Sequence, residues 1–439
     1  MESFKAPLVP ACDIRDALAA IYRRISWRIL PFLLSCYVLA YLDRVNISFA
    51  KLQMQQQLGM SDAVYGLGAG VFFLGYMLFE VPSNLLLARV GARKTISRIM
   101  VMWGLTSACM IFVHDTGTFY ILRFLLGVFE AGFAPGMIFY LTYWYPESRR
   151  ARVMAVVLMA GPVAGIVGGP LSTWIMTVCA GLHGLAGWQW LFLLEGSPCV
   201  LLGAAALVFL DDTPQQARWL SDEDKAHVTQ DIGQSARPGV HSSFGAALKD
   251  GRVYLMAFSY FCLICGLYTI SFWLPTLLRT AGVKDALLLG RYAALPYLVT
   301  VAAVPVFARR SDRLRERCLH SALPAIAGAL SLIAAAYMTR SLIGSIISMT
   351  VATTCIYAAY VVFWAIPTAY LKGAAAAGGI ALINSMGLLG GFISPVLIGW
   401  LKTLTGSLQI GLIVMATLLV VGAISILLNR LPRVVPRAS

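Results

Sequence analysis

The chain has 439 residues, of which 59% are hydrophobic and 12% are charged. This charged share is about half that of an ordinary soluble domain, so a water-soluble fold around one core is excluded and a membrane protein is indicated. The net charge of +14 does not indicate nucleic acid binding, because the basic residues gather beside the ends of apolar segments, where anionic lipid headgroups attract them.

Twelve apolar segments are long enough to cross a membrane, since a hydrocarbon core of about 30 Å needs roughly 20 residues per helix. The first group comprises residues 28–49, 64–87, 96–113, 117–141, 153–178 and 188–210. The second group comprises residues 254–278, 286–308, 319–338, 342–365, 374–400 and 407–429. We therefore predict an all-α membrane protein of twelve transmembrane helices in two pseudo-symmetric halves of six.

Polar stretches between the helices predict the organisation of the chain. Segment 1–26 leads into the sequence IYRRISWRI (21–29), which predicts a short helix along the inner membrane surface. The sequence ARWLSDEDKAHV (217–228) predicts one helix in a linker that is too short for a core of its own. The predicted segments are an N-terminal segment 1–27, a first half 28–210, a linker 211–252, a second half 253–429 and a tail 430–439.

The distribution of lysine and arginine predicts the orientation of these helices. Most of the 34 basic residues lie in segments on the same side as the N-terminus. Such residues concentrate on the cytoplasmic side of membrane proteins, so we expect both termini in the cytoplasm. The opposite side holds only Lys51, Arg279, Lys284, Arg291, Arg340 and Lys402.

Four ionisable residues fall inside predicted helices of the first half. Asp43 and Arg44 are adjacent on the first helix, and Arg123 and Glu130 lie on one face of the fourth, about 10 Å apart. An ionisable residue at membrane depth costs at least about 2.5 kcal/mol and is a candidate functional residue. Alternatively, the arginines could snorkel toward the outer interface, and the acids could form a structural ion pair.

These four charges suit the transport of an organic anion. Arginine stays charged and binds a carboxylate bidentately, so Arg44 and Arg123 are candidate substrate ligands. Burial and a nearby arginine act on the proton affinity of a carboxyl group in opposite directions. A carboxyl beside a substrate-binding arginine can therefore take up or release a proton as the anion comes and goes. We expect Glu130, and after it Asp43, to carry a coupled proton.

Two basic loops occupy matching positions in the two halves. NLLLARVGARKTI (84–96) follows the second helix and FARRSDRLRER (307–317) follows the eighth, as in duplicated secondary transporters. With the glycine-rich GPVAGIVGGPLS (161–172), this pattern resembles the major facilitator superfamily, although Ala88 stands where the family's loop signature has an acid. The resemblance implies two halves that rock about a central site. It also implies gating roles for the loop residues Arg89, Arg93, Asp312 and Arg313.

Longer motifs narrow this resemblance. Together they resemble the anion:cation symporter family, whose bacterial members import sugar acids, tartrate, phthalate and related aromatic carboxylates. The resemblance covers nearly the whole chain and implies proton-coupled import across the bacterial inner membrane. It also supports substrate and proton roles for the charged residues of helices one and four. The motifs are YLDRVNISFA (41–50), GYMLFEVPSN (75–84), RFLLGVFEAGFAPG (123–136), GWQWLFLLEGSP (187–198) and DDTPQQARWLSDED (211–224).

Four further residues are candidates for the substrate site, and similarity to sugar-acid transporters of that family implies that they line it. They are Tyr41, Tyr76, Trp364 and Asn384. Asn384 is the lone amide in the apolar stretch GGIALINSMGLLGG, so we expect it to face protein or water rather than lipid. Ordinary packing, or an interfacial position for an aromatic ring, is the alternative for each.

The leading hypothesis is a proton-coupled importer of an organic carboxylate, with efflux or uncoupled transport of the same anions as the alternative. A transporter-like receptor is disfavoured because the polar segments are too short for a soluble signalling domain. The sequence has no GxSxG, HExxH or GxxxxGK[ST] motif, so neither an enzyme nor an ATP-driven pump is expected. We expect no cofactor, metal site or nucleic acid partner. The expected form is a monomer that interacts with an organic anion, protons and membrane lipid.

Overall fold

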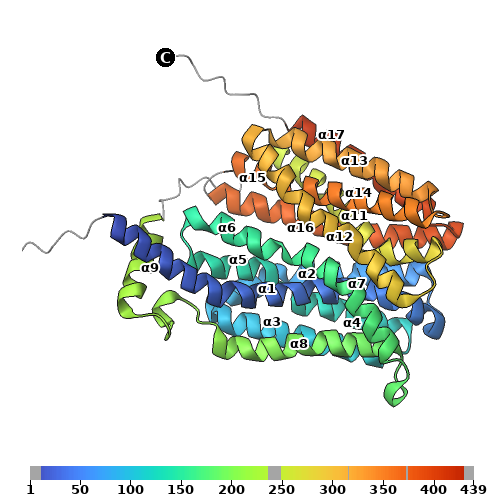
Figure 1. Ribbon diagram of the computed structural model, residues 1–439, viewed down its shortest axis with the longest axis horizontal. Coiled ribbons are helices and arrows are strands. Elements are labelled where there is room, and N and C mark those ends of the chain that lie inside the picture. The colour runs from blue at the N-terminus through green and yellow to red at the C-terminus, as the bar shows by residue number, and fades with distance from the viewer. Residues whose placement is uncertain (1–10, 236–248, 315, 372–373, 430–439) are drawn as a thin grey trace, which may run out of the picture.

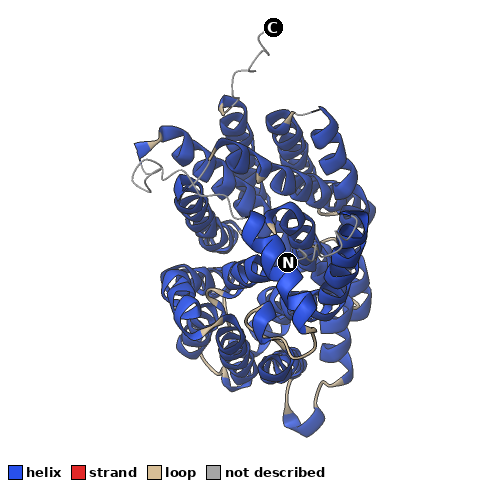
Figure 2. Ribbon diagram, turned by 90° about the vertical axis from the view of Figure 1, so that its left-hand side faces the viewer, coloured by secondary structure: helices blue, strands red, loops and turns tan. Residues whose placement is uncertain are grey.

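The computed structural model describes residues 11–235, 249–314, 316–371 and 374–429, and every regular element in these ranges is a helix. Most of the helices run along the long axis of the molecule, with the first half of the chain below and the second half above in Figure 1. Figure 2 shows the same bundle turned so that many of its helices are seen end-on.

The elements of the first half follow one another with short turns. They are α1 (Ala11–Leu58), α2 (Asp62–Val90), α3 (Ala92–Ala108), η1 (Cys109–Phe112), α4 (Thr116–Glu130), α5 (Phe133–Trp144), α6 (Glu147–Leu158), α7 (Ala160–Val178), η2 (Leu182–Gly184) and α8 (Gly187–Phe209). The linker contains η3 (Pro214–Gln216) and α9 (Asp222–Ser235). The second half contains α11 (Gly251–Thr280), α12 (Ala286–Leu314), α13 (Arg317–Tyr337), α14 (Leu342–Phe363), α15 (Ala365–Tyr370), α16 (Ala374–Thr405) and α17 (Gln409–Leu428).

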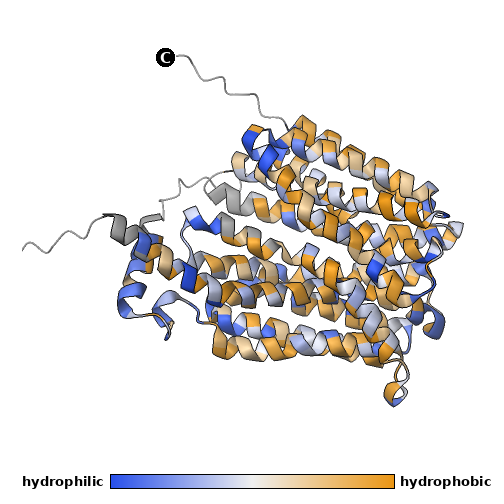
Figure 3. Cartoon of the chain, viewed as in Figure 1, coloured by the Kyte–Doolittle hydropathy of each residue, from blue (hydrophilic) through white to orange (hydrophobic). Residues whose placement is uncertain are grey.

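Among the described residues, 11 helical segments are long and apolar enough to cross a membrane. Hydrophobic residues dominate along the bundle, and hydrophilic residues gather toward its two ends (Figure 3). Of the predicted spans, only 153–178 is missing from the eleven, because glycine, proline, serine and threonine lower the hydropathy of α7. The chain is an all-helical, multi-pass membrane protein, as the sequence predicts.

The first helix is longer than predicted. It continues without a break through Asp43 and Arg44 and contains 48 residues, or about 72 Å at a rise of 1.5 Å per residue. The prediction of a separate helix along the membrane surface is wrong for its described part, because residues 11–26 extend the first span. Hydrogen bonds hold this extension against α9: Arg24 Nη2 donates to Asp224 Oδ2 at 3.0 Å.

Other boundaries also differ from the sequence prediction, and two of them have a clear local cause. The linker helix, predicted at 217–228, begins at Asp222. Ser221 caps it, because its Oγ accepts a hydrogen bond from a backbone N–H of the first turn at 3.2 Å. The span predicted at 117–141 is divided into α4 and α5. Gly132 has a φ of +83° between them, a left-handed conformation that interrupts a helix and that glycine adopts at little cost.

Polar contacts join the two halves at the end of the bundle remote from α9 (Figure 1). We call it the outer end, because the basic loops that predict the cytoplasmic side lie at the other. Asp62 of α2 forms ion pairs with Lys51 of α1 at 2.6 Å and with Lys402 of α16 at 3.0 Å. Lys51 Nζ lies 4.0 Å from the ring centroid of Trp273 in α11. The outer end is therefore closed.

Glycines bring helices of opposite halves close together. A Cβ on Gly66 of α2 would lie 2.3 Å from the carbonyl oxygen of Pro395 in α16. A Cβ on Gly169 of α7 would lie 2.6 Å from the carbonyl oxygen of Gly290 in α12. A larger residue at either position would push the two backbones apart. The glycine-rich stretch 161–172 thus permits close helix packing at Gly169.

Candidate functional site

Arg44 connects the two halves near the middle of the bundle. Its Nη2 pairs with Glu130 Oε1 of α4, and its Nη1 donates to the hydroxyl of Tyr268 in α11 at 3.0 Å. Arg44 is 8% exposed and Glu130 is 1% exposed, so water scarcely reaches this ion pair. The ring centroids of Tyr41 and Tyr76 lie 5.4 and 5.6 Å from the guanidinium carbon. Two charged residues and three tyrosines thus meet at one point.

Local sequence fixes both ends of α4, the helix that carries Arg123 and Glu130. At its start, Asp115 Oδ1 accepts the backbone N–H of Thr118 at 2.8 Å. This hydrogen bond holds the pKa of Asp115 below its ordinary value. Glu130 is the last helical residue before the break at Gly132. A Cβ on that glycine would lie 2.6 Å from a serine hydroxyl of α2, so the space also requires glycine.

Arg123 is buried with most of its hydrogen-bonding capacity unused. Its side chain has an exposed fraction of 0%. Its Nε donates to the carbonyl oxygen of Gly68 at 3.2 Å, and its guanidinium lies 5.3 Å from the ring centroid of Phe72. Nη1 and Nη2 have no hydrogen-bond partner among the described residues. Neither Arg123 nor Arg44 snorkels to the membrane surface.

Asp43 points away from Arg44 into the interior of the first half. Its Oδ1 accepts hydrogen bonds from Ser107 Oγ at 2.6 Å and from Asn46 Nδ2 at 3.0 Å. Its Oδ2 accepts a hydrogen bond from Trp103 Nε1. Adjacent helical residues point about 100° apart, so Arg44 reaches α4 and α11 while Asp43 reaches α3. The structure thus separates Asp43 from the Arg44 ion pair.

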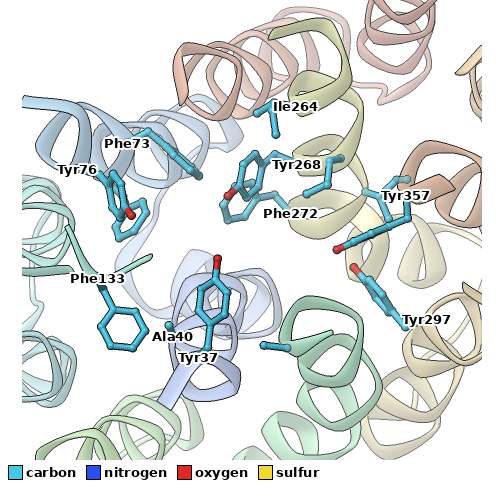
Figure 4. Close-up of a cluster of buried hydrophobic side chains, with 14 of the residues drawn as sticks. Tyr37, Ala40, Phe73, Tyr76, Phe133, Ile264, Tyr268, Phe272, Tyr297 and Tyr357 are labelled. Atoms are coloured by element: carbon cyan, nitrogen blue, oxygen red, sulfur yellow. The ribbon is translucent and has the colours of Figure 1, made fainter. Parts of the chain in front are cut away.

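A narrow cavity lies between α1 and α7 of the first half and α11, α12 and α14 of the second. Glycines of α7 form one wall, and the polar lining comes from Ser271 and the tyrosines Tyr41, Tyr268, Tyr297 and Tyr357. Because Tyr268 also binds Arg44, the cavity adjoins the buried ion pair. Figure 4 shows three tyrosines of this lining, Tyr268, Tyr297 and Tyr357, together with Tyr37 and Tyr76 of the first half.

The other predicted substrate ligands lie in different surroundings. Tyr41 lines the cavity and Tyr76 lies beside Arg44. Trp364, between α14 and α15, packs against Tyr260 with ring centroids 4.8 Å apart. Asn384 of α16 donates to Glu80 Oε1 of α2 at 3.1 Å, which adds a further polar link between the halves.

The predicted gating residues lie at the end of the bundle opposite the outer end, each within its own half. Arg89 is exposed at the end of α2. The backbone N–H of Arg93 donates to Asp212 Oδ1 at 2.8 Å, at the start of the linker. Asp312 pairs with Arg317 of the same half, and Arg313 is exposed. In the described part of the chain, no ion pair between the halves involves these four residues.

Sequence reasoning missed several partners of the buried charges. Tyr268 was not predicted to bind Arg44, and Ser107 and Trp103 were not predicted to bind Asp43. All three are neutral residues on helices whose neighbours the sequence does not reveal. Asn46 did carry a signal, because it lies three residues after Asp43 and hence on the same helix face. Within the described ranges, no group of three His, Cys, Asp or Glu residues could hold a metal ion.

Known proteins resemble this chain over most of its length. The family model of the Major Facilitator Superfamily matches residues 33–395. A candidate tartrate transporter of Agrobacterium vitis is 45% identical over 425 residues, which are 96% of this chain and 94% of that protein. NicT, a candidate metabolite transport protein of Pseudomonas putida, is 44% identical over 410 residues, 93% of this chain and 94% of that protein. The solved structure of a D-xylose–proton symporter has a TM-score of 0.74 at 14% identity, covering 91% of this chain and 97% of that one.

Proposed function

The chain belongs to the Major Facilitator Superfamily and is a secondary transporter rather than an enzyme, and on this premise we propose that it imports an organic carboxylate together with protons. Similarity to relatives named for tartrate and metabolite transport supports a small organic anion as the cargo. The bacterial origin of both relatives supports a location in the inner membrane. The proton gradient would supply the work.

The observation that carries this proposal is the contrast between the two buried arginines. Arg44 is neutralised by Glu130, whereas both terminal nitrogens of Arg123 lack a partner in the part of the chain that is described. A buried guanidinium with unused donors is unfavourable. A substrate carboxylate would satisfy it by accepting two parallel hydrogen bonds. The remainder of the substrate would then lie among Tyr41, Tyr76, Trp364 and Asn384.

Proton coupling follows from the ion pair between Arg44 and Glu130. Protonation of Glu130 removes its negative charge and releases Arg44 to bind the substrate. When the anion leaves toward the cytoplasm, Arg44 again attracts Glu130, which then gives up its proton on the same side. Anion and proton therefore cross together. Asp43 is the second candidate for a proton carrier, and the charged loop residues Arg89, Arg93, Asp312 and Arg313 would close the inner end when the outer end opens.

Counterflow in proteoliposomes tests the cargo and the coupling separately. Tartrate, a sugar acid and an aromatic carboxylate would each be offered first without a gradient and then with the outside more acidic than the lumen. We expect at least one of these anions to exchange without a gradient and to accumulate only with it. Anion uptake that is the same with and without the pH gradient would favour an uncoupled carrier. Failure of every carboxylate to exchange would overturn the anion assignment.

A further inference from the structure

Two lysines share one carboxylate at the outer end of the bundle. Asp62 Oδ1 of α2 pairs with Lys51 Nζ of α1 at 2.6 Å, and Asp62 Oδ2 pairs with Lys402 Nζ of α16 at 3.0 Å. In the described part of the chain, neither lysine pairs with any other acid. We call these three residues the outer triad. Its two positive charges exceed the single negative charge of Asp62.

The outer triad lies on the route from the outside to the cavity. Lys51 follows Phe49, which lines the cavity, by two residues on α1. Its Nζ donates to Thr276 Oγ1 at 3.3 Å and lies 4.0 Å from the ring centroid of Trp273. Both of these residues are on α11, within two residues of Pro275, which also lines the cavity. An anion that enters between the halves from the outside therefore passes the outer triad first.

The two lysines differ in their access to water. The Lys51 side chain is 0% exposed, and its Nζ lies 4.6 Å from the ring centroid of Tyr65. The Lys402 side chain is 20% exposed. Its Nζ lies 5.8 Å from the ring centroid of Trp273, whose buried Nε1 has no hydrogen-bond partner among the described residues. Lys402 is thus the cation of the triad that a dissolved anion can reach, and a neighbouring residue holds an unused donor.

Opening of the outer end acts differently on the two ion pairs. Lys51 and Asp62 both belong to the first half, whereas Lys402 belongs to the second. Gln55 of α1 holds Asp62 from the same side, because its Nε2 donates to Asp62 Oδ1 at 3.3 Å. When the halves separate, Asp62 therefore keeps a cation and a hydrogen-bond donor. Lys402 moves away with α16 and loses its counter-ion.

We propose that Lys402 is the first binding site for the carboxylate of the transported anion, and that this carboxylate replaces Asp62 there as the outer end opens. The inference rests on the proposed function, which makes the cargo a carboxylate. The exchange leaves no charge unpaired, because Lys51 neutralises Asp62 and the cargo neutralises Lys402. A cation at the entrance also raises the local concentration of anions. From Lys402 the anion moves inward to Arg44 and Arg123.

A latch that only holds the halves together would use the same ion pair but would not recognise an anion. Removal of Lys402 from such a latch would open the path equally to reagents of either charge. Removal of a binding site for carboxylates would specifically slow the entry of anions. The two roles therefore differ in one measurable quantity, the ratio of the rates at which anionic and cationic reagents enter from the outside.

Cysteine labelling measures this ratio without any cargo. Ser271→Cys, which lines the cavity, would be placed in a full-length background without the 9 native cysteines. It would be labelled with two membrane-impermeant methanethiosulfonates, one carrying a sulfonate and the other a trimethylammonium group. The fraction of molecules with an open outer end cancels in the ratio of the two rates. We expect Lys402→Gln to lower the ratio of anionic to cationic labelling about 3- to 10-fold, because one charge beside the path acts on the reagents with opposite sign.

Two variants make this measurement specific. Lys402→Arg retains the charge and should retain the wild-type ratio. Lys284→Gln removes the same charge from an exposed residue in the turn before α12 and should leave the ratio unchanged. An unchanged ratio in Lys402→Gln, even with both rates raised, would reduce Lys402 to a latch and overturn the proposal. An equal fall of the ratio in Lys284→Gln would also overturn it, because the general charge of the outer surface would then be the cause.

Anion exchange without a pH gradient gives the second readout. With the anion that the wild type exchanges, Lys402→Gln should raise the external KM several-fold at a similar maximal rate, and Lys402→Arg should restore the KM. An unchanged KM in Lys402→Gln would overturn the proposal even though the protein transports carboxylates. If the wild type exchanges no carboxylate, the proposed function fails instead, and the labelling ratio still shows whether Lys402 selects anions at the entrance.

Discussion

Arg123 illustrates how a single side chain links structure to transport. Its charge alone could be supplied by lysine, but its two unpartnered terminal nitrogens form a planar fork that lysine lacks. A charge-assisted hydrogen bond contributes about 1.5–3 kcal/mol, so Arg123→Lys should weaken binding of the transported anion about 10- to 100-fold. Isothermal titration calorimetry with the anion that exchanges in liposomes measures this change.

Arg340→Lys is the matched control for that substitution, because Arg340 is exposed in the turn before α14. It should bind the anion as the wild type does. Arg44→Lys should also weaken binding of the anion, because lysine cannot form the bidentate contact that arginine forms. Unchanged affinity in both Arg44→Lys and Arg123→Lys would place the anion site elsewhere in the molecule.

Glu130 should separate binding from coupling. Glutamine has nearly the same shape but neither binds nor releases a proton, and it leaves Arg44 without its ionic partner. We expect Glu130→Gln to exchange anion across liposomes at a rate comparable to the wild type and to lose accumulation driven by a pH gradient. Glu147→Gln, an exposed change at the start of α6, should retain both activities. If Glu130→Gln still accumulated substrate, the coupled proton would reside on another acid.

The buried charges could be found from the sequence, but their partners could not. Arg44, Arg123, Asp43 and Glu130 stand out because charge at membrane depth is costly. Their contacts depend on the rotation of each helix and on neutral residues of neighbouring helices. Asp43 and Arg44 are adjacent in the chain, yet a turn of about 100° sends one toward α3 and the other toward α4. Only the contact of Asn46 with Asp43 could be anticipated from the sequence, because the two residues lie on the same helix face.

At the scale of the helix, hydropathy predicted where most spans lie and local chemistry decided where they end. The pattern correctly carried the first helix through Asp43 and Arg44. It failed at the break in the fourth span, because Gly132 was not recognised as left-handed, and at the linker helix, because Ser221 was not recognised as its cap. Average polarity over about 20 residues does not register the backbone angle of one residue.

The packing of α2 against α16 supports a prediction about conformation. A side chain at Gly66 would meet the carbonyl oxygen of Pro395, a backbone atom that cannot turn aside. Gly66→Val should therefore open the outer end and expose the cavity to the outside. The measurement is labelling of Ser271→Cys, which lines the cavity, by a membrane-impermeant thiol reagent in a background without the 9 native cysteines.

Gly251→Val is the matched control for that packing, because a Cβ at Gly251 would meet no atom within 4 Å. It should leave the labelling rate of Ser271→Cys unchanged, whereas Gly66→Val should raise it. Equal labelling in the two variants would mean that the contact between α2 and α16 does not set the closure of the outer end. Size-exclusion profiles of both variants would confirm that they fold.

For the molecule as a whole, transport by alternating access requires that the halves separate at the outer end once in each cycle. The backbone N–H of Ala63 in α2 donates to Thr403 Oγ1 in α16 at 2.9 Å, so the two chains are adjacent there. A disulfide requires Cα atoms about 4.4–6.8 Å apart, a range compatible with this contact. Oxidation of Ala63→Cys/Thr403→Cys should therefore lock the outer end and abolish anion exchange, and a reducing agent should restore it.

A disulfide within one half should have no such effect, because rocking moves each half as a unit. Ser259 of α11 and Ser425 of α17 both belong to the second half, and their hydroxyl oxygens lie 2.8 Å apart. Oxidised Ser259→Cys/Ser425→Cys should exchange anion at the same rate as its reduced form. If the cross-half disulfide formed and exchange continued, the outer contacts would not need to break. Movement of the two halves against each other would then not be the transport step.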